Sequence, residues 1–288
     1  MPVDERLVDH QVAVCVGVLG PTTISAQSAT PRQRALIAAL ALAGGRGAGI
    51  DELADGVWAG RPPRSARASL QNQMTRLRRL HGDDLIVCEY TRYRLDRPTD
   101  VDVFERIVAG VRSAPATGAT IDSLARGLRL WRGTHYDDLA DSHAAEIERA
   151  RLAQLRGQAA DLLATGRIRI GDFEPCIADL RVEIEDDPYR DRAWELLFVA
   201  LQRAGRTGEA LAAHRLYVER LREQFGSGPN DALMAVGRAL QLGSPLELAS
   251  ERPEASFPTA PADASCGHGP MTRRCHAPRR GRTRRVEP

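Results

Sequence analysis

The spacing of apolar residues divides the chain into a short segment of mixed character and a long helical segment. Residues 11–19 alternate valine with other residues, which predicts a strand with one face in a core. Residues 22–26 can pair back as a short partner strand after a Gly-Pro turn. From Val101 to about residue 241 the apolar residues recur at helical spacing. The valines of the predicted strand face are Val12, Val14, Val16 and Val18.

Three helices are predicted between residues 30 and 80. The first covers 31–43, the second covers 51–58, and the third covers 61–80. A side chain that accepts a backbone hydrogen bond, or a proline whose missing N–H is tolerated in the first turn, marks the start of each helix. The boundary residues are the N-caps Thr30 and Asp51, the first-turn proline Pro31, and the Pro62-Pro63 pair of the third helix.

The third helix has one apolar face and one face of arginine, amide and hydroxyl side chains. It carries six arginines and no acid. Leu70, Met74 and Leu77 fall at i, i+4 and i+7, so they form a stripe that can pack on a core. A helical wheel places Asn72, Thr75 and Arg79 opposite the stripe, Arg64, Gln71 and Arg76 beside them, and Arg67 and Arg78 nearer to the stripe.

Such side chains offer the forked and bidentate hydrogen bonds that distinguish guanine from adenine in the major groove of DNA. An ordinary exposed helix with solvated arginines is the alternative, and it fits equally well when this helix is considered alone. The preceding short helix and tight turn favour DNA binding, because two helices joined in this way form a helix-turn-helix.

Residues 85–95 predict a β-hairpin with its tip at 89–92, which corresponds to the wing of a winged helix. Arg92 and Arg94 of this hairpin can reach the DNA backbone or the minor groove. In the first turn of the 31–43 helix, Arg32 and Arg34 together with backbone N–H groups can hold a phosphate. Simple surface exposure of these two side chains is the alternative.

The remainder of the chain predicts helices joined by short connectors. Trp194, Gly205, Ala210 and Tyr217 have the spacing of a tetratricopeptide helix pair, and Pro188 stands where the preceding unit would close. A helical bundle without repeats is the alternative. The predicted helices lie near 101–112, 120–131, 143–165, 172–186, 189–204, 207–225 and 230–241, with connecting loops at 133–139 and 166–171.

Composition narrows the class of protein. All 40 basic residues are arginine, and the net charge is +2 over 1–100, −4 over 101–248 and +4 over 249–288. Without lysine, a P-loop or Schiff-base mechanism is excluded. No apolar run approaches the length of a membrane span. The cysteines are five and scattered, which indicates a reducing cytoplasm rather than a disulfide framework.

Residues 249–288 are rich in Pro, Ala, Ser, Gly and Arg, and this composition predicts a disordered tail. Its arginines can add nonspecific attraction to phosphates. Cys266, His268, Cys275 and His276 lie there, but their spacing matches no common zinc pattern. No metal site and no cofactor are therefore expected. His135, Asp137 and Asp138 are interpreted as part of a polar connector rather than as an acid–base cluster.

Several segments together resemble the SARP-type antibiotic regulatory proteins of actinobacteria. In the first part these are TPRQRALIAALAL, IDELADGVWAGRPPRSARASLQNQMTRLRRL, YRL and VDVFERIVAG. LRLWRG and DPYRDRAWELLFVALQRAGRTGEALAAHRLYVERLREQFGSGPNDAL resemble the bacterial transcriptional activation domain of that family. The resemblance covers residues 12–242. It implies an OmpR-like winged helix with its recognition helix at 64–79 and its wing at 90–94, followed by a tetratricopeptide-like activation domain.

The fold class expected is therefore mainly α with a small β component. We expect a winged-helix domain at 1–100, a helical activation domain at 101–248 and a disordered tail at 249–288. By the resemblance, the protein is a sequence-specific transcriptional activator of a secondary-metabolite gene cluster and not an enzyme. It would bind direct repeats in double-stranded promoter DNA, as a dimer there, and recruit RNA polymerase in the cytoplasm, at the nucleoid. The alternative is an adaptor or effector-responsive regulator whose winged helix contacts protein.

Overall fold

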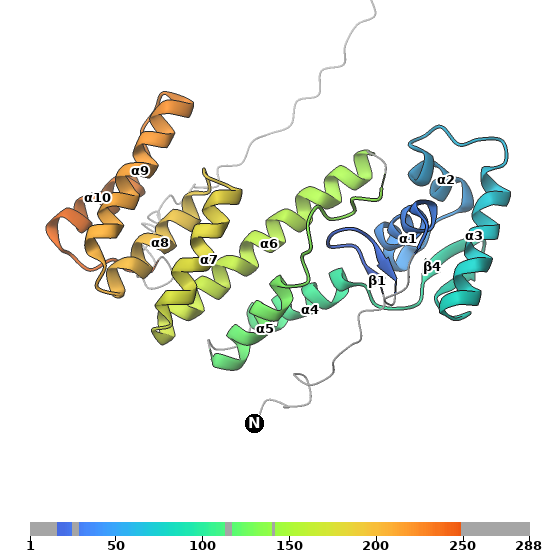
Figure 1. Ribbon diagram of the computed structural model, residues 1–288, viewed down its shortest axis with the longest axis horizontal. Helices are drawn as coiled ribbons and strands as arrows, with labels where there is room; N and C mark the ends of the chain where they lie inside the picture. The colour runs from blue at the N-terminus through green and yellow to red at the C-terminus, as the bar shows by residue number, and fades with distance from the viewer. Residues whose placement is uncertain (1–15, 25–28, 113–116, 140–141, 249–288) are drawn as a thin grey trace, which may run out of the picture. The chain divides into compact units, whose positions relative to one another are not determined.

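The computed structural model describes residues 16–24, 29–112, 117–139 and 142–248 (Figure 1). The predictions for Val12 and Val14 and for the 249–288 tail, with its arginines, cysteines and histidines, lie outside these residues. Within them the chain is mainly helical with small antiparallel sheets, as the apolar spacing predicts. None of the described helices has the length and apolar character needed to cross a bilayer.

The first part of the chain contains three helices and two small hairpins. β1 and β2 pair antiparallel, and so do β3 and β4. Ala48 forms an additional antiparallel bridge with Tyr93 of β4. The elements are β1 (Val16–Gly17), β2 (Thr23–Ile24), α1 (Pro31–Ala43), the short 3-10 helix η2 (Gly44–Arg46), α2 (Ile50–Trp58), α3 (Ala66–His81), β3 (Ile86–Glu89) and β4 (Arg92–Leu95). This order of strands, three helices and hairpin is the predicted winged helix.

The helix starts confirm one prediction and correct two. Thr30 caps α1, and its backbone N–H donates to Oε1 of Gln33 (2.9 Å), which completes a capping box. Gly49 rather than Asp51 occupies the N-cap of α2, because Asp51 lies inside the first turn. α3 begins at Ala66 and not at the proline pair. The Ala66 N–H donates to Pro63 O (2.9 Å), which closes a turn ahead of the helix.

The second part of the chain is a succession of helices close to the predicted ranges: α4 (Asp100–Arg112), α5 (Gly118–Leu128), α6 (His143–Ile170), α7 (Phe173–Asp186), α8 (Asp191–Arg203), α9 (Thr207–Phe225) and α10 (Asp231–Leu242). The loop predicted at 166–171 is wrong, since α6 continues to Ile170. Gly166 is buried in the helix, and a Cβ there would lie 3.1 Å from Ile121 Cγ1, so glycine allows α5 to approach α6. The helix ends at Gly171, whose φ of 79° favours glycine.

The residues of the predicted repeat lie where a helix pair needs them. Trp194, Ala210 and Tyr217 are buried between α8 and α9. The indole N–H of Trp194 donates to Pro188 O (2.9 Å), and Gly205 has a φ of 78° between the two helices. These contacts account for the tryptophan, glycine and proline that the repeat pattern singled out.

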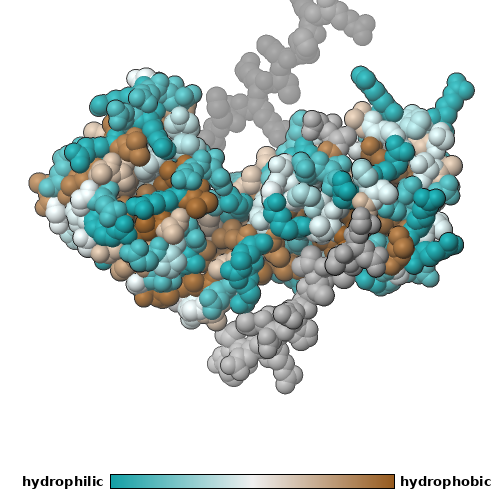
Figure 2. All heavy atoms as spheres, in the orientation of Figure 1, coloured by the Kyte–Doolittle hydropathy of each residue, from teal (hydrophilic) through white to brown (hydrophobic). Residues whose placement is uncertain are grey.

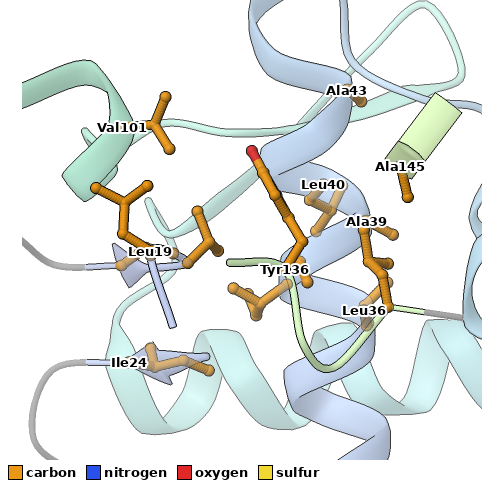
Figure 3. Packing of buried hydrophobic residues seen from close by; sticks show 14 of the residues in the cluster. Leu19, Ile24, Leu36, Ala39, Leu40, Ala43, Val101, Tyr136 and Ala145 are labelled. Atoms are coloured by element: carbon orange, nitrogen blue, oxygen red, sulfur yellow. The ribbon is translucent and has the colours of Figure 1, made fainter. Parts of the chain in front are cut away.

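The hydrophobic core of the winged helix extends into α4, α5 and the first part of α6. In Figure 3 the ring of Tyr136, from the loop between α5 and α6, lies among Leu19, Leu40 and Val101. The same core runs on to Leu163 of α6, and a second core begins with Ala164. The division of the chain at residues 100 and 248 stays a prediction, but burial of apolar residues is continuous across residue 100.

A buried carboxylate connects the two sides of this core. Asp100, at the start of α4, accepts hydrogen bonds from the N–H groups of Val18 (2.8 Å) and Leu19 (3.1 Å) and from Arg132 Nη2 (2.9 Å). The Arg132 N–H donates to Leu19 O (2.7 Å) and the Tyr136 N–H donates to Val18 O (2.8 Å). Burial raises the pKa of Asp100, while its three donors oppose the shift.

We expect Asp100→Ala to lower the free energy of unfolding by about 2–5 kcal/mol, because two buried amides lose their acceptor. Chemical denaturation of the full chain measures the change. Asp122→Ala removes an exposed carboxylate of α5 that has no partner among the described residues, and it serves as the control. Equal stability of the two variants would contradict a structural role for Asp100.

Candidate nucleic-acid interface

α3 lies on the first core with one face and presents the opposite face to solvent. Its buried residues are Ala66, Leu70, Met74 and Leu77, so the predicted stripe is correct. Where Figure 1 draws α3, Figure 2 shows hydrophilic side chains at the surface. The exposed residues of the helix include Arg67, Gln71, Asn72, Thr75, Arg76 and Arg79.

The outward face of α3 offers donors and acceptors of several kinds. Between Arg61 and His81 the chain contains no acid. Thr75 Oγ1 donates to Gln71 O (2.9 Å), so the hydroxyl proton is used and the oxygen lone pairs and methyl group remain for a ligand. Asn72 lies three residues before Thr75 and Arg79 lies four residues after it, so both are exposed about one helical turn away on the same face. Together they form the amide-hydroxyl-guanidinium row that the helical wheel predicts.

Arg64, Arg76 and Arg79 make no side-chain hydrogen bond or ion pair to the part of the chain that the structure describes. Arg64 lies in the turn before α3 rather than on the helix, because the helix begins two residues later. All three guanidinium groups are exposed, and each can therefore contact a phosphate or a base edge without breaking an internal ion pair.

Arg67 and Arg78 are held by the protein itself. Arg67 forms an exposed ion pair with Asp51 of α2 (3.0 Å). Arg78 Nε donates to the carbonyl of Ile86 (2.8 Å), which links α3 to the first strand of the wing. These contacts agree with their position near the buried stripe on the helical wheel.

The two arginines of the wing are also paired. Arg92 donates to the carbonyls of Arg46 (3.1 Å) and Gly47 (2.8 Å) and to Glu52 of α2 (2.8 Å). The Gly49 amide and, in second place, Arg92 keep the pKa of Glu52 below its usual range. Arg94 pairs with Glu89 (3.0 Å) and with Asp96. Arg92 therefore fixes the wing against α2, and Arg94 joins its two strands.

At the tip of the wing, Tyr90 is 98% exposed and follows Glu89 directly. Tyr90 and Thr91 have φ values of 47° and 71°, and both lie in the left-handed region. Two-residue hairpin turns with two positive φ values favour Asn-Gly, so Tyr-Thr is a costly choice at this place. The sequence locates the tip of the wing, but it does not indicate that the ring of Tyr90 is almost fully exposed.

The two arginines in the first turn of α1, where the sequence predicts a candidate phosphate site, both lie against groups of the protein itself. Arg32 is exposed, with its Cζ 4.8 Å from the centroid of the Trp58 ring. Arg34 forms an ion pair with Asp138 (2.8 Å), whose carboxylate also accepts the Thr22 N–H (2.7 Å). Burial would raise the pKa of Asp138, but these hydrogen bonds outweigh it and lower the pKa. The connector role expected for Asp138 agrees with these contacts.

Comparison with known proteins places this architecture in a family. The family model described as the bacterial transcriptional activator domain matches residues 99–241. The transcriptional regulator RedD of Streptomyces coelicolor is 30% identical over 275 residues, which cover 87% of this chain and 76% of RedD. The regulatory protein DnrI of Streptomyces peucetius is 30% identical over 80% of this chain and 93% of its own length. The chain belongs to the SARP family of actinobacterial transcriptional regulators.

A solved member of similar architecture supports the fold of this SARP chain. EmbR of Mycobacterium tuberculosis, determined in complex with a low-affinity phosphopeptide, matches with a TM-score of 0.69 and 31% identity. The match covers 81% of this chain and 66% of EmbR. In the comparison of sequences the chain spans 64% of the length of EmbR at 32% identity.

The geometry of the wing tip yields a stability prediction. We expect Tyr90→Asn combined with Thr91→Gly to raise the free energy of unfolding by about 1–2 kcal/mol, because the pair tolerates two positive φ values. Thermal and chemical unfolding of the full chain measure the effect. Tyr90→Phe keeps the backbone demand and should leave stability unchanged. A less stable double variant would mean that the tyrosine ring supports the wing.

Proposed function

We propose that this SARP protein is a sequence-specific DNA-binding transcriptional activator of a secondary-metabolite gene cluster. The observation that carries the proposal is the exposed, acid-free outward face of α3, which stands on a helix-turn-helix next to a hairpin. Arginine and asparagine at such positions can form bidentate hydrogen bonds with guanine and adenine. Family membership supports the assignment to transcription.

Within this proposal the interface residues divide by their internal contacts. Asn72, Thr75 and Arg79 contact base edges, with Gln71 beside them, since they occupy the centre of the exposed face. Arg64 and Arg76 contact phosphates. Arg32 is exposed beside the ring of Trp58 and contacts a phosphate in this proposal. Four arginines that have internal partners, Arg67, Arg78, Arg92 and Arg94, orient the helix and the wing.

The helical part from α4 onward is proposed to contact RNA polymerase, in line with the activator-domain match. Binding to promoter direct repeats would place two protomers head to tail on double-stranded DNA, in the cytoplasm at the nucleoid. The division into domains at 1–100, 101–248 and 249–288 belongs to the same proposal. An adaptor that contacts only protein remains the competing function, and DNA binding distinguishes the two.

Selection of bound DNA from a random pool with the full chain, followed by footprinting, tests the proposal. We expect Asn72→Ala and Arg79→Ala each to cost about 1–3 kcal/mol in binding to the selected site and to relax its sequence preference. Arg215→Ala is the matched control, because it removes an exposed arginine from α9. If Arg79→Ala bound like Arg215→Ala, the assignment of this face would be wrong.

A second measurement addresses phosphate contacts. The affinity for the selected DNA should fall steeply with salt, since bound phosphates release counterions. Arg64→Ala and Arg76→Ala should each reduce the slope of log affinity against log salt by about 1, with little change in preferred sequence. A salt-independent affinity would favour the adaptor function instead.

A further inference from the structure

A cleft of about 380 Å³ lies between α5, α6 and α7, away from the proposed DNA interface. Ala160 and Ala164 of α6 lie one turn apart on its lining, and Ala125 of α5 and Leu180 of α7 contribute from opposite sides. Where Figure 1 draws α6 between α5 and α7, Figure 2 shows apolar surface with hydrophilic side chains around it. Alanine at these places leaves the cleft open, because a larger side chain would fill it.

The charges that line the cleft are unequal. It contains the guanidinium groups of Arg129, Arg156 and Arg167 and the carboxylates of Asp179 and Glu183. Arg156 pairs with Glu183 (2.8 Å), and Arg167 pairs with Asp179. Arg129 is exposed at the end of α5, and its side chain has no acidic partner among the described residues. Arg129 is therefore the lining cation that can receive an anionic occupant without losing an internal ion pair.

The uncharged part of the lining is apolar and includes one thiol. Cys176 of α7 is buried in its lining, and its thiol lies 3.6 Å from Ala164 O, to which it donates. Burial raises the pKa of Cys176 to about 12, so the thiol stays protonated at neutral pH. Leu128, Leu163 and Leu180 complete an apolar lining. An occupant must therefore be apolar over most of its length.

The size of the cleft selects a small molecule. The volume of about 380 Å³ lies in the range of sites for such molecules. Ligand pockets for compact organic molecules begin at roughly 300 Å³ and combine apolar walls with a few polar groups. We propose that this cleft binds an apolar small molecule that carries one carboxylate or sulfonate, with its anionic group on Arg129.

The site spans the boundary between the two hydrophobic cores. Leu163 belongs to the first core and Ala164 to the second, and both line the cleft. A ligand there contacts α5 on one side and α7 on the other. Binding would therefore hold the two cores together, and the ligand should raise the thermal stability of the full chain.

The test uses the full chain and two fluorescent probes of the same shape. 8-Anilino-1-naphthalenesulfonate is apolar with one anionic group, and N-phenyl-1-naphthylamine lacks that group. We expect one sulfonate probe to bind per chain and to raise the unfolding temperature. Arg129→Gln should weaken it by about tenfold or more, because a charge-assisted contact is lost, and leave the neutral probe unchanged.

Arg126→Gln is the matched control, because Arg126 lies on the same helix, outside the cleft lining, and donates to Ser123 Oγ (2.9 Å). It should bind both probes like the original chain. Ala125→Leu and Ala160→Leu should each weaken both probes by filling the cleft, and unfolding curves identify a variant that does not fold. Ala125 is partly exposed, so Ala125→Leu should fold even where Ala160→Leu, at a buried position, does not.

Three results would overturn the proposal. They are the absence of saturable binding to the full chain, equal effects of Arg129→Gln and Arg126→Gln, and binding that a folded Ala125→Leu variant leaves unchanged. The measurement contains no DNA, so its failure leaves the proposed DNA interface unaffected, and loss of DNA binding in α3 variants leaves this site unaffected.

Discussion

The described structure depends on the buried carboxylate of Asp100, which accepts hydrogen bonds from three donors. Asp100 is 1% exposed, and it binds two amides of the chain after β1 and the side chain of Arg132. A buried charge is tolerated only where hydrogen bonds replace its hydration. The hydrogen bonds of Asp100 therefore fix the positions of three segments relative to one another: the start of α4, the N-terminal hairpin and the loop after α5. The core around Tyr136 fills the space that these contacts define.

Local signals predicted most of the fold because helix and turn chemistry is short-ranged. The N-cap at Thr30, the apolar stripe of α3 and the helical spacing after residue 100 require only neighbouring residues. The features that the sequence did not predict depend on contacts between residues far apart in the chain. Gly166 suggests a loop when only the sequence is considered, yet it provides room for Ile121 of another helix. The contact of Asp100 with Val18 joins residues 82 positions apart, which no local pattern can indicate.

The candidate DNA interface was predictable in orientation but not in the state of each arginine. The helical wheel separates Asn72 and Arg79 from the buried stripe, and the structure places them in the same way. The helical wheel cannot show that Glu52 of α2 binds Arg92, or that Arg78 donates to a carbonyl of the wing. Those pairs depend on tertiary contacts between elements. The exposure of the Tyr90 ring likewise depends on how the hairpin packs on the rest of the fold, so the sequence does not indicate it.

The shared core has a consequence for the modularity of such regulators. Recombination between relatives is tolerated best where few contacts cross the junction, and residue 100 is a poor junction in this respect. A cut there would separate Phe104 and Val108 of α4 from the β1 and α1 residues of the same core. The unit that carries its own buried surface continues to Leu163, within α6. A chimera that joins the N-terminal part of this chain to the helical part of a relative would therefore need to keep α4, α5 and the first part of α6 with it.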